Sequence, residues 1–139
     1  GVWQVLAKFP VGSFDRIVAL ADMYIEFART HPSDYGVLFA PVQGRKRRLD
    51  DTSFGTAVAA LEQCVADCIA AGVFAPGDPK MISLFLWSRV HGMIGLSMAF
   101  DLAEHFPEID LTSGLEQLYA ATRPYALAGL APRVNSPKE

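Results

Sequence analysis

The chain has 139 residues, of which 51% are hydrophobic and 19% charged, and this composition excludes a disordered protein and favours one compact domain. The net charge of −3 argues against nucleic-acid binding by these residues. No apolar run reaches the ~18 residues that a membrane-spanning helix needs. The chain begins at Gly1 without a methionine or a signal-peptide pattern, so we expect a fragment of a longer protein.

The first half of the sequence predicts helices only. Residues 2–8 are expected to be the end of an earlier helix, and an amphipathic helix should run from Phe14 to about Thr30. Pro32 ends that helix and suits the first turn of a short one that reaches Phe39. Residues 40–52 predict a mobile loop, whose basic residues 45–48 are either solvated or in contact with phosphate.

A second amphipathic helix is predicted from about Ser53 to Ala71, with Gly72 as its stop. It carries both cysteines, Cys64 and Cys68, whose spacing on one helical face does not suit a disulfide. We expect them to be buried hydrophobic residues of a reduced, cytoplasmic protein, with a thiol sensor as the alternative.

The segment Pro79 to Glu104 predicts one long helix that is apolar on almost every side. A chain of this length has few elements with which to surround such a helix, so we expect a second subunit to cover part of it. Small residues fall on one narrow stripe when the helix is unrolled: Ser88, Gly92, Gly95 and Ala99.

Arg89 is the single charge in the middle of this helix, and a guanidinium among apolar residues needs a partner. An acidic side chain of either subunit is the first candidate, namely Asp101, Glu104 or Glu116. An anionic ligand is the second.

A last helix is predicted from Ser113 to Arg123, because Ser113 and Glu116 have the spacing of a capping box. Pro124 should kink or end it, and residues 132–139 should form a flexible tail. Its apolar stripe consists of Leu115, Leu118, Tyr119 and Thr122.

Two motifs carry a resemblance to a known family. One is Trp87-x-x-x-His91-Gly92 within the long helix; the other is the segment 24–39, in which a helix ends in His31-Pro32 and is followed by Tyr35 and a terminal Phe39. In this order they resemble the WHG type of C-terminal domain of TetR-like transcriptional regulators. The resemblance covers about residues 14–127.

The resemblance implies an all-α helical bundle whose last two helices form a four-helix dimer interface with a second copy. It makes residues 1–12 the stub of a connecting helix and residues 13–131 the effector-binding and dimerisation domain of a regulator, expected to be a repressor. Operator DNA would be bound only through an N-terminal domain that is absent from this chain.

The middle helices would enclose a hydrophobic or aromatic effector. The candidate ligand-binding residues are Tyr24, Phe27, Tyr35, Phe39, Cys68, Trp87, His91 and Met98. The candidate dimer-interface residues are Ser88, Gly92, Gly95, Ala99, Leu115, Leu118 and Tyr119. For the aromatic residues, ordinary core packing is an equal alternative, and His91 is expected first as a hydrogen-bonded core residue.

No catalytic residue, metal site or cofactor is predicted, because the sequence lacks the HExxH, phosphate-loop and nucleophile-elbow patterns. A small all-helical enzyme and a stand-alone ligand-binding protein remain the alternatives.

Overall fold

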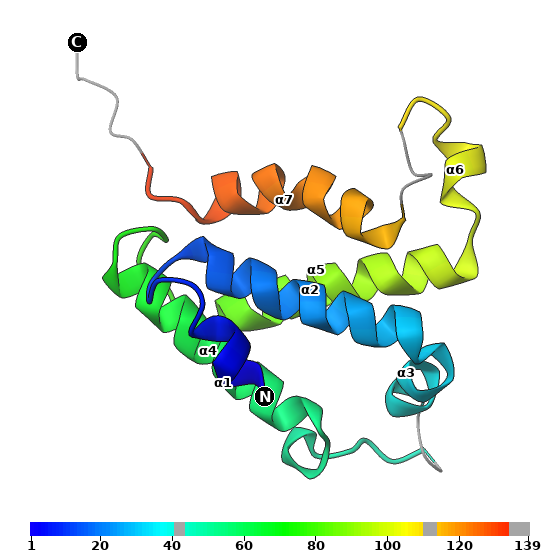
Figure 1. Cartoon of the computed structure of the whole chain (residues 1–139), viewed down its shortest axis with the longest axis horizontal. Helices are drawn as coiled ribbons and strands as arrows, with labels where there is room; N and C mark the ends of the chain where they lie inside the picture. Colours follow the sequence, from blue (N-terminus) through cyan, green and yellow to red (C-terminus); the bar gives the residue numbers. More distant parts are fainter. Residues whose placement is uncertain (41–43, 110–113, 134–139) are drawn as a thin grey trace.

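The computed structural model describes residues 1–40, 44–109 and 114–133, and this part of the chain is all-α, without a strand (Figure 1). This confirms the predicted fold class. The helices are α1 (Val2–Leu6), α2 (Phe14–Thr30), α3 (Pro32–Phe39), the short 3-10 helix η1 (Leu49–Asp51), α4 (Phe54–Ala70), α5 (Pro79–Ala99), α6 (Leu102–His105) and α7 (Leu115–Leu130).

The boundary between α2 and α3 lies where proline chemistry places it. His31 leaves the helical region with φ −131° and ψ 58°, because the ring of Pro32 disfavours helical geometry in the preceding residue. Pro32 then occupies the first turn of α3, where its missing N–H is not needed. The predicted bounds of both helices are confirmed.

The interior consists of two clusters of buried residues. The first joins α1, α4 and the beginnings of α2 and α5, and its buried members are Leu6, Ile17, Ala19, Ala60, Cys64, Val65, Cys68, Phe74 and Leu86. The second joins the later part of α2 to α3, α5 and α7, and its buried members are Ala21, Ile25, Ala28, Tyr35, Val90, Ile94 and Tyr119. The chain therefore builds one core at each end of α2.

The cysteines belong to the first core. Cys64 and Cys68 are free thiols, exposed by only 1% and 0%. Burial raises the pKa of the Cys68 thiol to about 11, so it stays protonated and weakly nucleophilic at neutral pH. Both observations support the buried-hydrophobic interpretation and leave the thiol-sensor alternative without support.

Gly12 brings the start of α2 against the end of α4. Its φ is +81°, and a Cβ at this position would lie 2.9 Å from the Cβ of Ala71. Only glycine fits this close approach without strain. The turn therefore holds the first core together.

The basic cluster in the loop before α4 is partly structural. The guanidinium of Arg47 donates to the carbonyl oxygens of Leu38 and Val37, at 3.1 and 3.3 Å. These carbonyls belong to the last turn of α3, where basic side chains satisfy unpaired acceptors. Arg45, Lys46 and Arg48 are exposed, as predicted for a solvated cluster.

The prediction that the long helix reaches Glu104 is wrong, because α5 ends at Ala99. Phe100 adopts extended geometry, with φ −134° and ψ 150°, and the Asp101 carboxylate then accepts a hydrogen bond from the Glu104 backbone N–H at 3.2 Å. This side-chain cap starts a new helix, α6, instead of continuing the old one.

Of the two predicted effects of Pro124, a kink or an end of the last helix, the end is wrong. Pro124 lies inside α7, which continues to Leu130, and the helix is preceded by Gly114; Ser113 lies outside the described residues. Beyond the proline, Leu127 and Leu130 pack against the first core, and the Leu130 carbonyl accepts from the Ala75 N–H at 2.8 Å. This packing offsets the cost of a proline in a helix.

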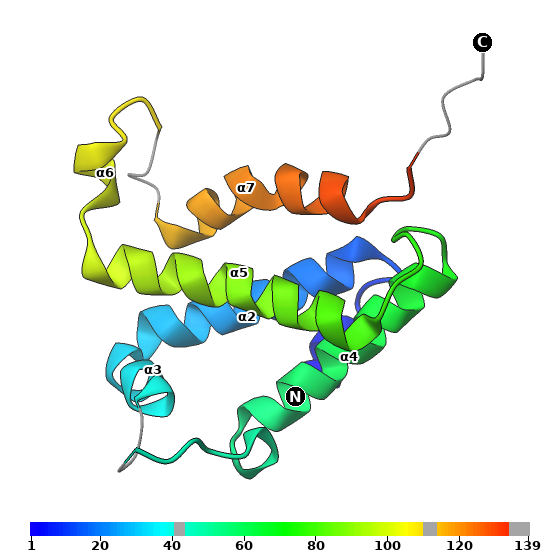
Figure 2. The ribbon, with the colours of Figure 1, turned by 180° about the vertical axis from the view of Figure 1, so that it is seen from behind.

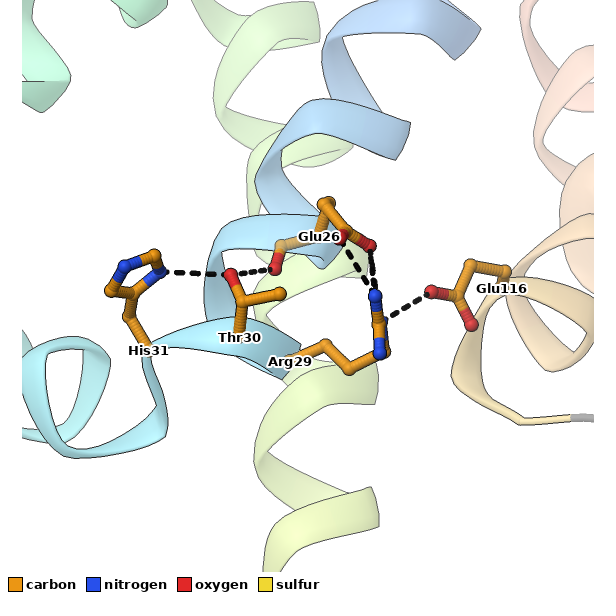
Figure 3. A network of polar contacts seen from close by, with 5 residues as sticks. All are labelled: Glu26, Arg29, Thr30, His31 and Glu116. Atoms are coloured by element: carbon orange, nitrogen blue, oxygen red, sulfur yellow. Dashed lines mark hydrogen bonds and ion pairs between the residues drawn. The ribbon is translucent and has the colours of Figure 1, made fainter.

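A polar network joins the end of α2 to the start of α7 (Figure 3). Arg29 lies 2.7 Å from a carboxylate oxygen of Glu26 and 3.5 Å from one of Glu116, and the Thr30 hydroxyl donates to the Glu26 carbonyl at 2.7 Å. These groups are exposed or partly exposed, so water screens the ion pairs and their contribution to stability is small.

Candidate ligand pocket and apolar outer face

A pocket of about 200 Å³ lies among α2, α4 and α5. We call it the central pocket, and its lining residues are Val2, Ile17, Leu20, Ala21, Met23, Tyr24, Phe27, Ser53, Phe54, Ala57, Val58, Leu61, Leu86, Trp87, Val90 and Tyr119. Ser53 is the exposed residue among them, which puts the opening at the start of α4. The lining is apolar apart from a few hydroxyl and indole groups, as is usual for small-molecule sites.

Three of the eight candidate ligand residues line this pocket, namely Tyr24, Phe27 and Trp87. Tyr35, Phe39 and His91 lie beside it as a cluster of rings, with centroids 4.8 Å apart for Tyr35–Phe39 and 4.2 Å apart for Phe39–His91. These six residues are therefore neighbours, although they come from α2, α3 and α5.

The other two candidates lie elsewhere. Cys68 is packed in the first core, and Met98 is half exposed near the end of α5. Neither lines the central pocket. The helical period predicts that both side chains face inward, but it does not predict which part of the interior each one reaches.

The helix α4 was expected at the pocket through Cys68, but the residues with which it lines the pocket were not predicted. Phe54, Ala57, Val58 and Leu61 form one wall. The ring of Phe54 packs against two of the candidate ligand residues: its centroid lies 5.4 Å from that of Tyr24 and 6.2 Å from that of Phe27. The apolar face of this helix was the available signal, yet a core and a pocket have the same apolar pattern.

A row of polar side chains crosses the boundary between the pocket and the ring cluster. The Trp87 Nε1–H donates to the Tyr24 hydroxyl at 3.0 Å, and the Tyr35 hydroxyl donates to the same oxygen at 3.4 Å. Tyr35 in turn is hydrogen-bonded to Nδ1 of His91. His91 is thus hydrogen-bonded, as expected for a structural histidine.

Burial determines the protonation of this row. It raises the pKa values of the Tyr24 and Tyr35 hydroxyls, and it lowers the pKa of the His91 imidazole. All three groups are therefore neutral at physiological pH. The row holds no charge that could attract an ionic ligand.

Within one subunit, no acidic side chain of the described residues contacts Arg89, so Asp101, Glu104 and Glu116 of the same subunit are wrong as its predicted partners. Its Nη2 donates to the Tyr119 carbonyl at 3.1 Å and to the Thr122 hydroxyl at 2.6 Å, and the guanidinium carbon lies 4.1 Å from the centre of the Tyr119 ring. These neutral acceptors and the cation–π contact satisfy only part of this partly buried cation, because its Nη1 is buried without a hydrogen-bond partner among the described residues.

The side of α5 that faces away from the pocket is apolar and exposed, and no described helix covers it (Figure 2). It carries the small-residue stripe of Ser88, Gly92, Gly95 and Ala99, all exposed. Larger side chains flank the stripe: Met81, Leu84, Phe85 and Leu96 are each about half exposed or more. Nothing lies within 4 Å of a Cβ added at Gly92 or Gly95.

The neighbouring helix α7 also presents small and apolar side chains outward. Ala120, Ala121, Pro124 and Ala128 are exposed, and Tyr125 is exposed by 80%. Of the three residues predicted on this helix, Tyr119 is only 3% exposed and Leu115 packs on the second core, whereas Leu118 is partly exposed. We call the exposed sides of α5 and α7 together the outer face.

A comparison with protein-family models supplies the deciding observation. Residues 17–121 match the model described as the tetracyclin repressor-like C-terminal domain, which covers more than half of the chain. The chain belongs to this family. The resemblance inferred from the motifs of α2, α3 and α5 is confirmed.

Comparisons of this TetR-like domain with curated proteins and with solved structures find no match. In the part of the domain that the structure describes, no helix is long and apolar enough to cross a membrane. The same residues hold no group of three or more His, Cys, Asp or Glu side chains that could bind a metal ion.

Proposed function

We propose that this TetR-like domain is the effector-sensing and dimerisation part of a transcriptional repressor. The central pocket binds a small, mainly apolar effector, and the outer face pairs with a second copy of the chain. DNA binding belongs to an N-terminal domain of the parent protein. The observation that carries this proposal is the position of α5, which lines the pocket with one side and forms the outer face with the other.

The pocket supports effector binding through its composition. Its walls come mainly from α2, α4 and α5, with Val2 of α1 and Tyr119 of α7, and they contain several aromatic rings. An apolar ligand would therefore gain contact area without losing hydrogen bonds. Trp87 lines it and would sense occupancy directly.

Because the domain belongs to the TetR-like family, a regulatory role is favoured over a catalytic one. Serine, histidine and acidic side chains are present, but Ser53 is the pocket-lining serine and no histidine or acid lines the pocket with it. A nucleophile without a base nearby is weak.

A ligand screen on the purified domain tests the proposal, with two readouts. In a Trp3→Phe background, an effector should change Trp87 emission saturably and raise the melting temperature through binding to the folded state. Ala57→Phe, which places a ring in the pocket, should abolish both responses. Ala59→Phe, on the exposed side of the same helix, is the matched control and should retain them.

Loss of the responses in the control variant, or their survival in Ala57→Phe, would place the ligand outside the central pocket and refute this part of the proposal.

A further inference from the structure

The hydroxyl of Tyr24 is the centre of the polar row beside the pocket. It accepts from Trp87 Nε1–H and from Tyr35 Oη–H. The tautomer of His91 fixes the direction of this row: with its proton on Nδ1, His91 donates to Tyr35, and Tyr35 donates its own proton to Tyr24. In this arrangement two donors, Trp87 and Tyr35, point at the Tyr24 oxygen.

In this arrangement the hydroxyl proton of Tyr24 has no acceptor among the described hydrogen bonds. Both hydrogen bonds of its oxygen are accepted ones, and none of the described hydrogen bonds takes the Tyr24 O–H as donor. The group is neutral, because burial raises its pKa. A hydroxyl that accepts twice is also a stronger donor, since hydrogen bonds in a chain polarise one another.

The ring of Tyr24 is held firmly while its proton is free to be donated. Its centroid lies 5.7 Å from that of Tyr35 in an edge-to-face arrangement, and Phe54 packs on it from α4. Tyr24 lines the central pocket, so the available acceptor for its proton is water or a ligand in that space. A preorganised donor of this kind discriminates between ligands that have an acceptor and those that lack one.

We infer that Tyr24 donates a hydrogen bond to the effector, and that the effector is a neutral carbonyl compound with an otherwise apolar body. This inference rests on the proposed function of the pocket. No lining residue is an acid, a lysine, an arginine or a histidine, so an ionic group would enter without a counter-charge. A carbonyl oxygen accepts without bringing a donor that would itself need a partner.

The volume of the pocket guides the choice of a probe. A closed apolar cavity of roughly 150 Å³ accommodates benzene. The 200 Å³ of the central pocket therefore accommodate at least a single six-membered ring with a small substituent. Acetophenone is a suitable probe, and α-methylstyrene is its match in shape, with a methylene group in place of the carbonyl oxygen.

The test compares the affinities of these two probes by ligand-observed NMR titration of the full chain. In the wild type, the Tyr24 hydrogen bond favours acetophenone. Tyr24→Phe keeps the ring and removes the donor, so the ratio of acetophenone affinity to α-methylstyrene affinity should fall about five- to tenfold. Ser53→Ala and Tyr119→Phe remove the other hydroxyls of the lining and should leave the ratio unchanged.

A second measurement uses the wild type alone and does not depend on the folding of a variant. The infrared carbonyl band of bound ¹³C-carbonyl acetophenone should lie at lower wavenumber than in hexane, because a donated hydrogen bond weakens the C=O bond. A band at the hexane position would overturn the inference.

The outcomes separate the inference from the proposed function. If both probes bind and Tyr24→Phe leaves the ratio unchanged, the pocket binds ligands but Tyr24 is not the donor, and only the inference fails. If neither probe binds the wild type, the inference fails together with this reading of the pocket. A ratio that falls in Ser53→Ala instead would move the donor to α4.

Discussion

At the scale of single residues, the polar contacts in the interior of the described domain are hydrogen bonds to neutral groups, and the ion pairs lie at the surface. Arg89 illustrates why the sequence could not predict its own contacts. The periodicity of α5 places Arg89 on a stripe, but its partners depend on the height at which α7 passes, which no pattern within one helix encodes. The Thr122 hydroxyl and the Tyr119 carbonyl meet it there.

His91 gives the domain a predictable response to pH. Burial lowers the pKa of His91 below its ordinary value of 6.5, so between these two pKa values the unfolded chain binds a proton that the folded chain does not. The free energy of unfolding should therefore fall as the pH falls through about 6.5 and level off below the folded-state pKa.

The measurement is urea denaturation at several pH values from 7.5 to 5.0. His91→Asn keeps a polar group near the Nδ1 position without titrating, so its decrease in stability should be smaller than that of the wild type. His105→Asn, at an exposed position of α6, is the control and should follow the wild type. Asp22 has the opposite sign, because burial raises its pKa from 3.8, and it acts nearer pH 4. Identical profiles for His91→Asn and the wild type would contradict the prediction.

At the scale of helices, sequence reasoning succeeded where a boundary is encoded locally. The junction at Pro32 and the start of α5 after Asp78, whose carboxylate accepts from the Lys80 N–H, are both set by residues at the boundary itself. It failed at Phe100, where the cap of α6 competes with the continuation of α5. The spacing of Asp101 and Glu104 was a signal for that cap, but the apolar run across it favoured one helix.

Pro124 allows a test of how much tertiary packing stabilises α7. The proline lacks the N–H that would bond to the carbonyl four residues earlier, so Pro124→Ala should increase the free energy of unfolding by about 1–3 kcal/mol. Denaturant unfolding of the domain at a fixed protein concentration measures this. Pro132→Ala, which lies beyond the end of α7, should have little effect. A loss of stability in Pro124→Ala would mean that the proline contributes contacts of its own, for example on the outer face.

At the scale of the whole molecule, the outer face gathers large exposed apolar side chains, and such a patch marks an interaction surface. Tyr125 and the exposed large side chains of α5 lie over two adjacent helices, as in half of a helix-bundle core. The sequence predicted the α5 half of this face from its stripe of small residues. On α7 it named Leu115, Leu118 and Tyr119 but not the exposed Tyr125, because a stripe within one helix does not tell which of its sides meets the core.

We expect the purified domain to be a homodimer through the outer face. Gly95→Trp meets no atom of its own subunit within 4 Å of its Cβ, so it should leave the fold intact while it overpacks the contact. The dissociation constant of the dimer should increase about tenfold or more. Analytical ultracentrifugation measures this, with Ala59→Trp on the exposed side of α4 as the control. A wild-type monomer at high micromolar concentration would contradict the dimer.

The position of the central pocket between the two cores has a mechanical consequence. Its lining takes Ile17 and Leu86 from the first core and Ala21, Val90 and Tyr119 from the second, so the pocket lies between the two cores. A ligand in the pocket would contact residues of both cores at once. Binding would thus couple the packing at one end of the domain to the packing at the other.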